Sequence, residues 1–252
     1  MTEAEWLACE DVEPMLRHLK GAVGERKFRL TECAFMRRFW HLLSDPRSRR
    51  AVEVDERVAD GEATRDELRE ACAAAEAAFD QIHQSHFSGK RPERPYYGGS
   101  VSAAQHAAFP SYDMPEWFGA GRPDAERFRT FVNLQWYGTP AFPLAGDPPA
   151  PDGPRDIDTE GRVQADLLRD IFGNPFRPAP PSLGPARLPP AVVALAQSIY
   201  DARAFDRMPE LADALERAGC ADADVLAHCR GQRPEGGHVR GCWVVDAILG
   251  KS

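Results

Sequence analysis

The stretch that decides the fold reads VVALAQSIYDARAFDRMPELADALERAG and covers residues 192–219. Its apolar residues recur at the spacing that places them on one face of a helix. The first face consists of Val192, Leu195, Ala196, Ile199 and Tyr200. The second consists of Met208, Leu211, Ala212 and Leu215. With Asp206 as the predicted cap and Gly219 as the stop, the stretch predicts two amphipathic helices in succession.

Helix signals continue on both sides of this stretch. Upstream, a helix is predicted from about Thr159 to Phe172, where Gly173 ends it. Downstream, Asp222 is placed to cap a short helix, and the loop GQRPEGG leads to a last helix. The core-facing residues of the last helix are Trp243, Val244, Ala247 and Ile248. Residues 159–252 therefore predict a C-terminal helical lobe with short connections.

Residues 1–86 predict a second set of helices, the N-terminal helical lobe. Thr2 with Glu5 forms a capping box. An apolar stripe runs from Glu25 to Leu43, and Asp45 followed by Pro46 starts the next helix, which Gly61 ends. Thr64 with Glu67 forms another capping box before a long Ala-rich helix that reaches about His86.

Residues 87–158 differ in character and predict an aromatic- and Pro-rich insertion and connector. Twelve aromatic residues lie between Phe87 and Phe142, too many for a disordered linker. One helix is predicted from about Asp124 to Tyr137, and a short hairpin around Tyr96 to Val101 stays open. The predicted fold class is mainly α: a helical bundle of roughly eight to ten helices with an irregular aromatic-rich insertion.

Charge and composition narrow the class of protein. The net charge of −8 and the pI of about 5.4 argue against nucleic-acid binding, which needs an excess of clustered Lys and Arg. The N-terminus carries no apolar signal sequence, and no apolar run is long enough for a membrane span. Six scattered cysteines fit reduced thiols. We therefore expect a cytoplasmic protein that contacts neither nucleic acid nor membrane.

Several strings resemble an uncharacterised bacterial family associated with planctomycete-type genomes. At the C-terminal end these are LLRDIFGNPFRP, LAHCRG and HVRGCWVVDAILGK, and near the N-terminus MTEAEWLACEDVEPML, RKFRLTECAFMRRFWHLL and RSRRAVEVDERVADG. Members of that family typically read RLFACACCRR where this chain reads RLTECAFMRR, so Cys33 has no neighbouring cysteine here. The resemblance covers roughly the first 85 and last 90 residues. It implies kinship and helical content, and no activity.

The first candidate site is a metal site near the C-terminus, with zinc as the expected ion. Its residues are Cys220, His228, Cys229, His238 and Cys242. Thiolates and neutral imidazoles are good zinc ligands, and four of them would close a structural site. If the last helix starts by His238, then His238 and Cys242 share one of its faces. Two alternatives stay open: these residues simply pack in the core, or Cys242 is a nucleophile with a histidine as base and Asp246 as orienter.

A second candidate metal site lies near the end of the long Ala-rich helix. Asp80, His83 and His86 occur in FDQIHQSHF, and Asp80 and His83 share a helical face. Inward-facing residues of this kind can bind a divalent metal in a helical bundle. The alternative is an exposed polar helix end.

The third candidate site is a binding surface in the aromatic insertion. Its residues are Tyr96, Tyr97, Tyr112, Trp117, Trp136 and Tyr137. Clustered Tyr and Trp are typical of protein interfaces, although they also occur in a small core. No P-loop, G-x-G-x-x-G, G-x-S-x-G or H-E-x-x-H motif occurs. The sequence therefore favours a non-enzymatic interaction or regulatory module with a protein partner; the alternative is a metal-binding protein or metal-dependent enzyme.

Overall fold

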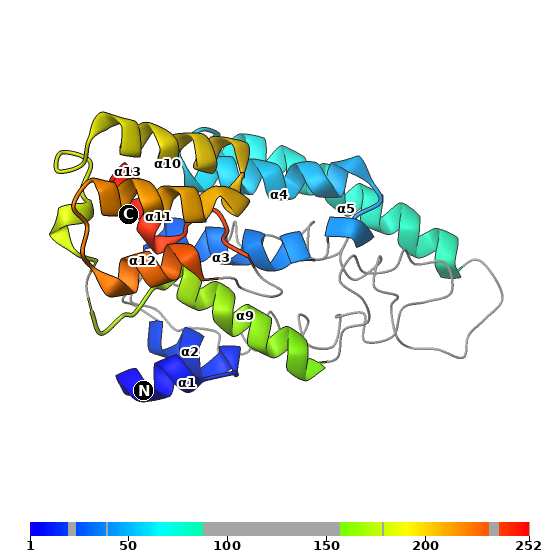
Figure 1. Cartoon of the computed structure of the whole chain (residues 1–252). Coiled ribbons are helices and arrows are strands. Elements are labelled where there is room, and N and C mark those ends of the chain that lie inside the picture. The colour runs from blue at the N-terminus through cyan, green and yellow to red at the C-terminus, as the bar shows by residue number, and fades with distance from the viewer. Residues whose placement is uncertain (20–23, 39, 88–156, 178, 232–236, 252) are drawn as a thin grey trace. The chain divides into compact units, whose positions relative to one another are not determined.

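The structure, a computed structural model, describes residues 1–19, 24–38, 40–87, 157–177, 179–231 and 237–251. These residues form ten α-helices and three short 3-10 helices, and no strand occurs among them (Figure 1). The prediction of a mainly α-helical bundle is confirmed. The aromatic insertion, with its predicted helix and possible hairpin, lies outside the described residues.

The chain divides into two compact units. Unit 1 combines residues 1–27 with residues 161–252, and unit 2 comprises residues 28–160. The first 27 residues therefore belong with the C-terminal helices, a pairing across the whole length of the chain that no sequence pattern indicated.

Unit 1 contains seven of the described α-helices and two 3-10 helices, besides the first residues of α3. The α-helices are α1 (Glu3–Ala8), α2 (Val12–Leu19), α9 (Ile157–Phe172, from residue 161 on), α10 (Pro190–Ala202), α11 (Met208–Arg217), α12 (Ala223–Arg230) and α13 (Trp243–Leu249), and the 3-10 helices are η2 (Pro181–Leu183) and η3 (Phe205–Arg207). Helices α10 to α13 surround one core, in which Ile199, Leu211, Leu215, Val244 and Ile248 are fully buried.

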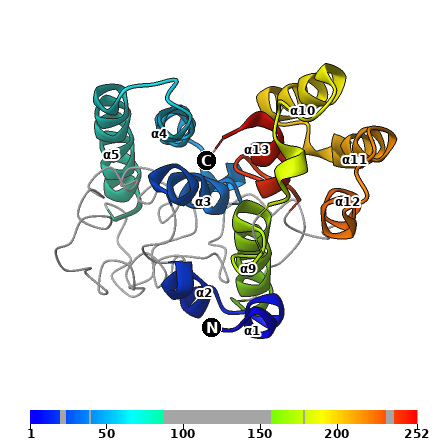
Figure 2. The same cartoon turned by 90° about the vertical axis from the view of Figure 1, so that its left-hand side faces the viewer.

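Within unit 1, helix α1 lies beside α9 in both views (Figures 1 and 2). The indole Nε1–H of Trp6 donates a hydrogen bond to the carbonyl of Gly173 at 3.0 Å. The guanidinium of Arg169 donates to the carbonyl of Trp6 at 2.9 Å and also to that of Cys9. A fully buried Trp6 therefore fixes the N-terminal helix at the C-terminal end of α9.

Local signals set most helix ends in unit 1 as predicted. The Thr2–Glu5 capping box is present, and the Asp222 carboxylate accepts hydrogen bonds from the first backbone amides of α12. Gly173 adopts a φ of 63° directly after α9, where a side chain would be strained. The prediction for Asp206 was wrong. It lies inside η3, and α11 begins after Arg207 without a side-chain cap, because the 3-10 turn leads directly into the helix.

Unit 2 is built on α3 (Glu25–Arg38, from residue 28 on), η1 (Trp40–Leu42), α4 (Pro46–Ala59) and α5 (Arg65–Phe87). Helices α4 and α5 pack against each other through small and branched residues, among them Ala51, Leu68 and Ala75. Asp45 caps α4 ahead of Pro46, as predicted. Between α3 and α4, Arg29 donates to Asp55 at 2.7 Å with both side chains buried.

The length and composition of a helix decide whether it can span a membrane. Among the helices of the described residues, none combines the length and the apolar character that crossing a bilayer requires.

Candidate metal centre

Four side chains from three separate segments of unit 1 converge on one buried point. Asp170 is near the end of α9, His228 is on α12, and His238 and Cys242 precede α13. One ligand atom from each residue lies within 4.8 Å of all the others. Such convergence of a carboxylate, two imidazoles and a thiol defines a group that could hold a metal ion.

The four side chains are already in direct contact. His238 Nδ1 lies 2.6 Å from Asp170 Oδ1, and His228 Nε2 lies 3.2 Å from the same oxygen. Cys242 Sγ lies 3.1 Å from His228 Nε2 and 3.9 Å from His238 Nδ1. Tetrahedral zinc with bonds of about 2.0–2.3 Å separates its ligand atoms by about 3.3–3.7 Å. The observed separations bracket that range, so small side-chain adjustments would fit the ion.

A tight turn before α13 positions His238 and Cys242 in the cluster. The amide of Cys242 donates to the carbonyl of Val239 at 3.0 Å, and Gly241 adopts a φ of 90° that other residues rarely reach. The amide of Val239 also donates to Asp170 Oδ2 at 2.9 Å, which attaches the turn to α9. The condition for a shared helical face of His238 and Cys242 is not met, because α13 begins only at Trp243.

The electrostatics of the cluster centre on the Asp170 carboxylate, which has no exposed surface. Burial raises its pKa, but the hydrogen bonds from His228 and His238 outweigh burial and leave the pKa below its usual value. Asp170 is therefore ionised at neutral pH. Burial, together with this negative charge, raises the pKa of the Cys242 thiol well above its usual value. Without a cation, Cys242 thus stays a thiol.

The ring nitrogens that face away from the cluster, His228 Nδ1 and His238 Nε2, differ in their hydrogen bonding. The indole Nε1–H of Trp243 donates to His228 Nδ1 at 3.1 Å. His238 Nε2 is buried and has no hydrogen-bond partner among the described residues. A buried ring nitrogen without a partner is uncommon in folded proteins.

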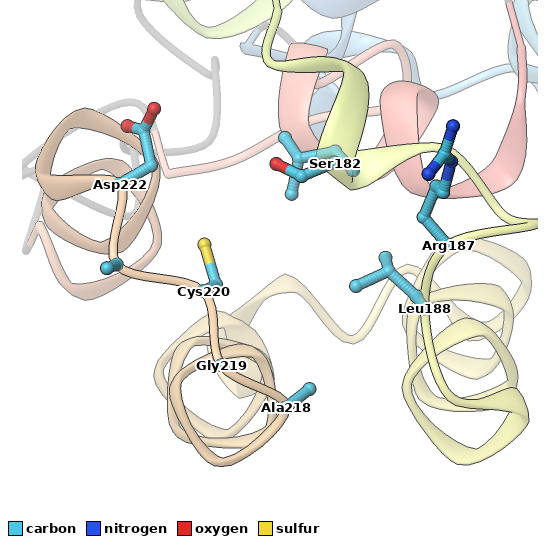
Figure 3. Close-up of a pocket in the computed structure, with 9 residues that line it drawn as sticks. Ser182, Arg187, Leu188, Ala218, Gly219, Cys220 and Asp222 are labelled. Atoms are coloured by element: carbon cyan, nitrogen blue, oxygen red, sulfur yellow. The ribbon is translucent and has the colours of Figure 1, made fainter.

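The structure brings three of the five predicted metal ligands together and leaves two apart. Cys229 follows His228 on α12 but is part of the apolar core of unit 1, where burial raises the pKa of its thiol to about 12. Cys220 lines a cavity of about 370 Å³ between η2 and the α11–α12 connection, where its side chain lies across the cavity from Leu188 (Figure 3).

Asp170 is the ligand that sequence reasoning missed. A signal was present, since Asp170 follows Leu167 by three residues and Val163 by seven and so falls on the apolar stripe of α9. A carboxylate at such a position must find a partner inside the protein. The sequence alone does not reveal which partner it finds.

The alternative with Cys242 as a nucleophile fails on geometry and on acidity. Asp246, its proposed orienter, is occupied by cations instead. Arg26 binds the Asp246 carboxylate at 2.7 and 3.0 Å, and Lys27 binds it at 2.8 Å. A thiol whose pKa is raised by burial is also a poor nucleophile.

Of the other two candidate sites, the Asp80–His83–His86 site is partly described and the aromatic surface is outside the described residues. Asp80 is exposed on α5, and the backbone at His83 and His86 is helical, but their side chains lie outside the described residues. The six predicted binding aromatics also lie outside them. Among the residues that the structure describes, the Asp170–His228–His238–Cys242 group is the only candidate for a metal site.

Comparisons with known proteins give no further assignment. No family model, curated protein or solved structure matches this chain.

Proposed function

We propose that this chain is a zinc-binding helical protein, in which zinc joins α9, α12 and the turn before α13. One observation carries the proposal: side chains 58 to 72 residues apart in sequence, Asp170 to His228 and Asp170 to Cys242, place their ligand atoms within 4.8 Å at a buried point. A thiolate and two imidazoles favour zinc over harder divalent ions, which prefer oxygen ligands.

A structural role for the ion fits better than a catalytic one. Four protein ligands fill a tetrahedral shell and leave no position for water or substrate. The ligands are also closed off: Asp170 and Cys242 are fully buried, and both histidine side chains are 6% exposed. Zinc would lower the pKa of Cys242 and take up its thiolate, so the folding of unit 1 and zinc binding would be coupled.

The zinc-held unit is compatible with the predicted interaction module. We propose that its helices support a surface for a protein partner, with the aromatic residues of the insertion as the contact region. Cysteine thiols stay reduced in the cytosol, so a cysteine ligand agrees with the proposed cytoplasmic location. Kinship with the planctomycete-type family is proposed on the same strings of sequence, which include all four proposed ligands.

A cobalt titration tests the zinc proposal. Co²⁺ is a spectroscopic substitute for zinc, and a tetrahedral site with one thiolate gives visible ligand-field bands and a near-ultraviolet sulfur-to-cobalt band. We expect both bands to saturate at one Co²⁺ per chain and to disappear on addition of zinc. Absence of the sulfur band at saturating Co²⁺ would remove Cys242 from the site.

Matched cysteine variants locate the site. Cys242→Ser should abolish the sulfur-to-cobalt band, whereas Cys229→Ser, 13 residues earlier and also buried, should retain it. Loss of the band in both variants would point to a general loss of structure, which far-ultraviolet circular dichroism would detect. Loss in Cys229→Ser alone would contradict the proposed ligand set.

A further inference from the structure

Trp243 contacts the candidate metal centre through a hydrogen bond that fixes the protonation of His228. An indole Nε1–H is only ever a donor, so His228 Nδ1, 3.1 Å away, must be the acceptor. A doubly protonated ring has no acceptor nitrogen, so this hydrogen bond also requires a neutral His228. The remaining ring proton is therefore on Nε2.

Nε2 is the nitrogen that faces the other ligands. It lies 3.1 Å from Cys242 Sγ and 3.2 Å from Asp170 Oδ1, and its proton can be donated to either. His228 thus accepts a hydrogen bond at Nδ1 and donates one from Nε2, so both ring nitrogens have suitable partners. This arrangement needs no metal ion.

A metal ion at the same point needs the opposite tautomer. Coordination uses the lone pair of Nε2, so the proton of a neutral ring must then be on Nδ1. In that state two N–H groups, one from His228 and one from Trp243, would face each other across 3.1 Å. Metal-bound histidines usually donate this second N–H to an acceptor, and here a donor occupies that position.

Trp243 cannot easily turn away. Its ring packs over Gly173, where an added Cβ would lie 3.0 Å from Trp243 Cγ. Gly173 is held in turn by the hydrogen bond from Trp6 to its carbonyl. A change at His228 would therefore be transmitted to Trp243 and to the contact between α1 and α9.

We propose that the site exchanges between a hydrogen-bonded metal-free form and a zinc-bound form, and that the Trp243–His228 hydrogen bond opposes zinc binding. This inference rests on the proposed zinc site and defines its regulation. On zinc binding the ring proton of His228 moves from Nε2 to Nδ1, and that of His238 moves from Nδ1, where it faces Asp170, to Nε2. Cys242 releases its thiol proton to solvent, and Trp243 gives up its acceptor. The zinc is then exchangeable and its affinity is set partly by Trp243.

Nitrogen NMR of the full chain tests the two forms directly. Long-range ¹H–¹⁵N spectra distinguish the tautomers of each histidine. We expect the His228 proton on Nε2 without zinc and on Nδ1 with zinc, while the indole N–H resonance of Trp243 moves as its hydrogen bond is lost. A His228 proton on Nδ1 in the metal-free protein would overturn the inference.

A Trp243→Phe variant tests the effect on affinity. It retains an aromatic ring over Gly173 and removes the competing N–H. Zinc affinity, measured by competition with a chromophoric chelator, should increase about tenfold, since a partly buried donor left without an acceptor is costly. Trp40→Phe, in unit 2, is the control and should leave the affinity unchanged.

The outcomes separate this inference from the zinc proposal. Zinc binding to the wild type with an unchanged Trp243 resonance, or with no gain in Trp243→Phe, overturns the inference and leaves the zinc site in place. Failure of the wild type to bind zinc at all overturns both. If Trp243→Phe does not fold, the tautomer measurement on the wild type still decides the matter.

Discussion

Both units contain a buried carboxylate beside a buried cysteine, but the two clusters differ in what surrounds them. In unit 1, Asp170 and Cys242 are joined by two imidazoles. In unit 2, Asp55 accepts from Arg29 at 2.7 Å, and the Cys33 thiol donates to Asp55 at 3.6 Å. A neutral imidazole can coordinate a metal ion through a nitrogen lone pair, whereas a guanidinium offers only N–H hydrogen-bond donors. A buried cysteine and carboxylate therefore define a metal site only with such neighbours.

The pKa values of the two buried carboxylates are also shifted in opposite directions. The hydrogen bonds from His228 and His238 outweigh burial and lower the pKa of Asp170. Burial raises the pKa of Asp55, and the interactions with Arg29 do not fully offset it. The ionised Asp170 in unit 1 can therefore attract a metal cation, whereas Asp55 in unit 2 is already paired with the Arg29 guanidinium.

Removal of that built-in cation should have the largest effect. Arg29→Met leaves Asp55 buried without its partner, and we expect the free energy of unfolding to fall by about 3–5 kcal/mol in urea denaturation. The double variant Arg29→Met/Asp55→Leu should regain most of this loss. A single variant as stable as the wild type would show that the ion pair does not hold α3 and α4 together. Zinc binding should survive in either variant.

Zinc should stabilise unit 1 by a smaller amount. Zinc at a hundred times its dissociation constant should add about 2.7 kcal/mol to the unfolding free energy, and a strong chelator should remove it. His238→Ala should abolish the difference between zinc and chelator. The same difference measured in Arg29→Met should persist; its disappearance there would mean that the two clusters are not independent.

Acid should distinguish the two carboxylates in the metal-free protein. The pKa of Asp170 in the folded protein is below its ordinary value of 3.8, so the stabilising effect of its ionised carboxylate is present above about pH 4 and is lost as the pH falls further. We expect Asp170→Asn to flatten this acid limb by on the order of 1–2 kcal/mol. Asp55→Asn should not flatten it, because the pKa of Asp55 is raised. Equal acid limbs for the wild type and Asp170→Asn would contradict the assigned direction.

Loss of a helix cap should have the smallest effect, and it should be similar in the two units. Thr64 and Glu67 exchange hydrogen bonds at the start of α5, as Thr2 and Glu5 do at the start of α1. Thr64→Ala should cost about 1 kcal/mol of unfolding free energy without altering zinc affinity. A change in zinc affinity would indicate that the cap influences unit 1.

The sequence predicted the helices well because their ends depend on local chemistry. Both capping boxes, the Asp45–Pro46 start and the Gly173 stop act within a few residues, and all are present. Asp206 was the exception, because a 3-10 turn replaced the predicted cap.

The candidate site was only partly predictable because it depends on contacts between distant segments. The sequence indicated His228, His238 and Cys242 through residue type alone, but it suggested a shared helical face where the structure has a tight turn. Asp170 joins them only because α9 packs beside that turn. Neither Asp170 nor the pairing of residues 1–27 with the C-terminal helices follows from a local pattern.

Zinc content of the purified chain tests the central claim most directly. Untagged protein, dialysed against metal-free buffer after loading with zinc, would be measured by elemental analysis and native mass spectrometry. The account predicts one zinc per chain for the wild type and for Cys33→Ser, and none for His228→Ala. No zinc in the wild type, or zinc retained equally by His228→Ala, would contradict it.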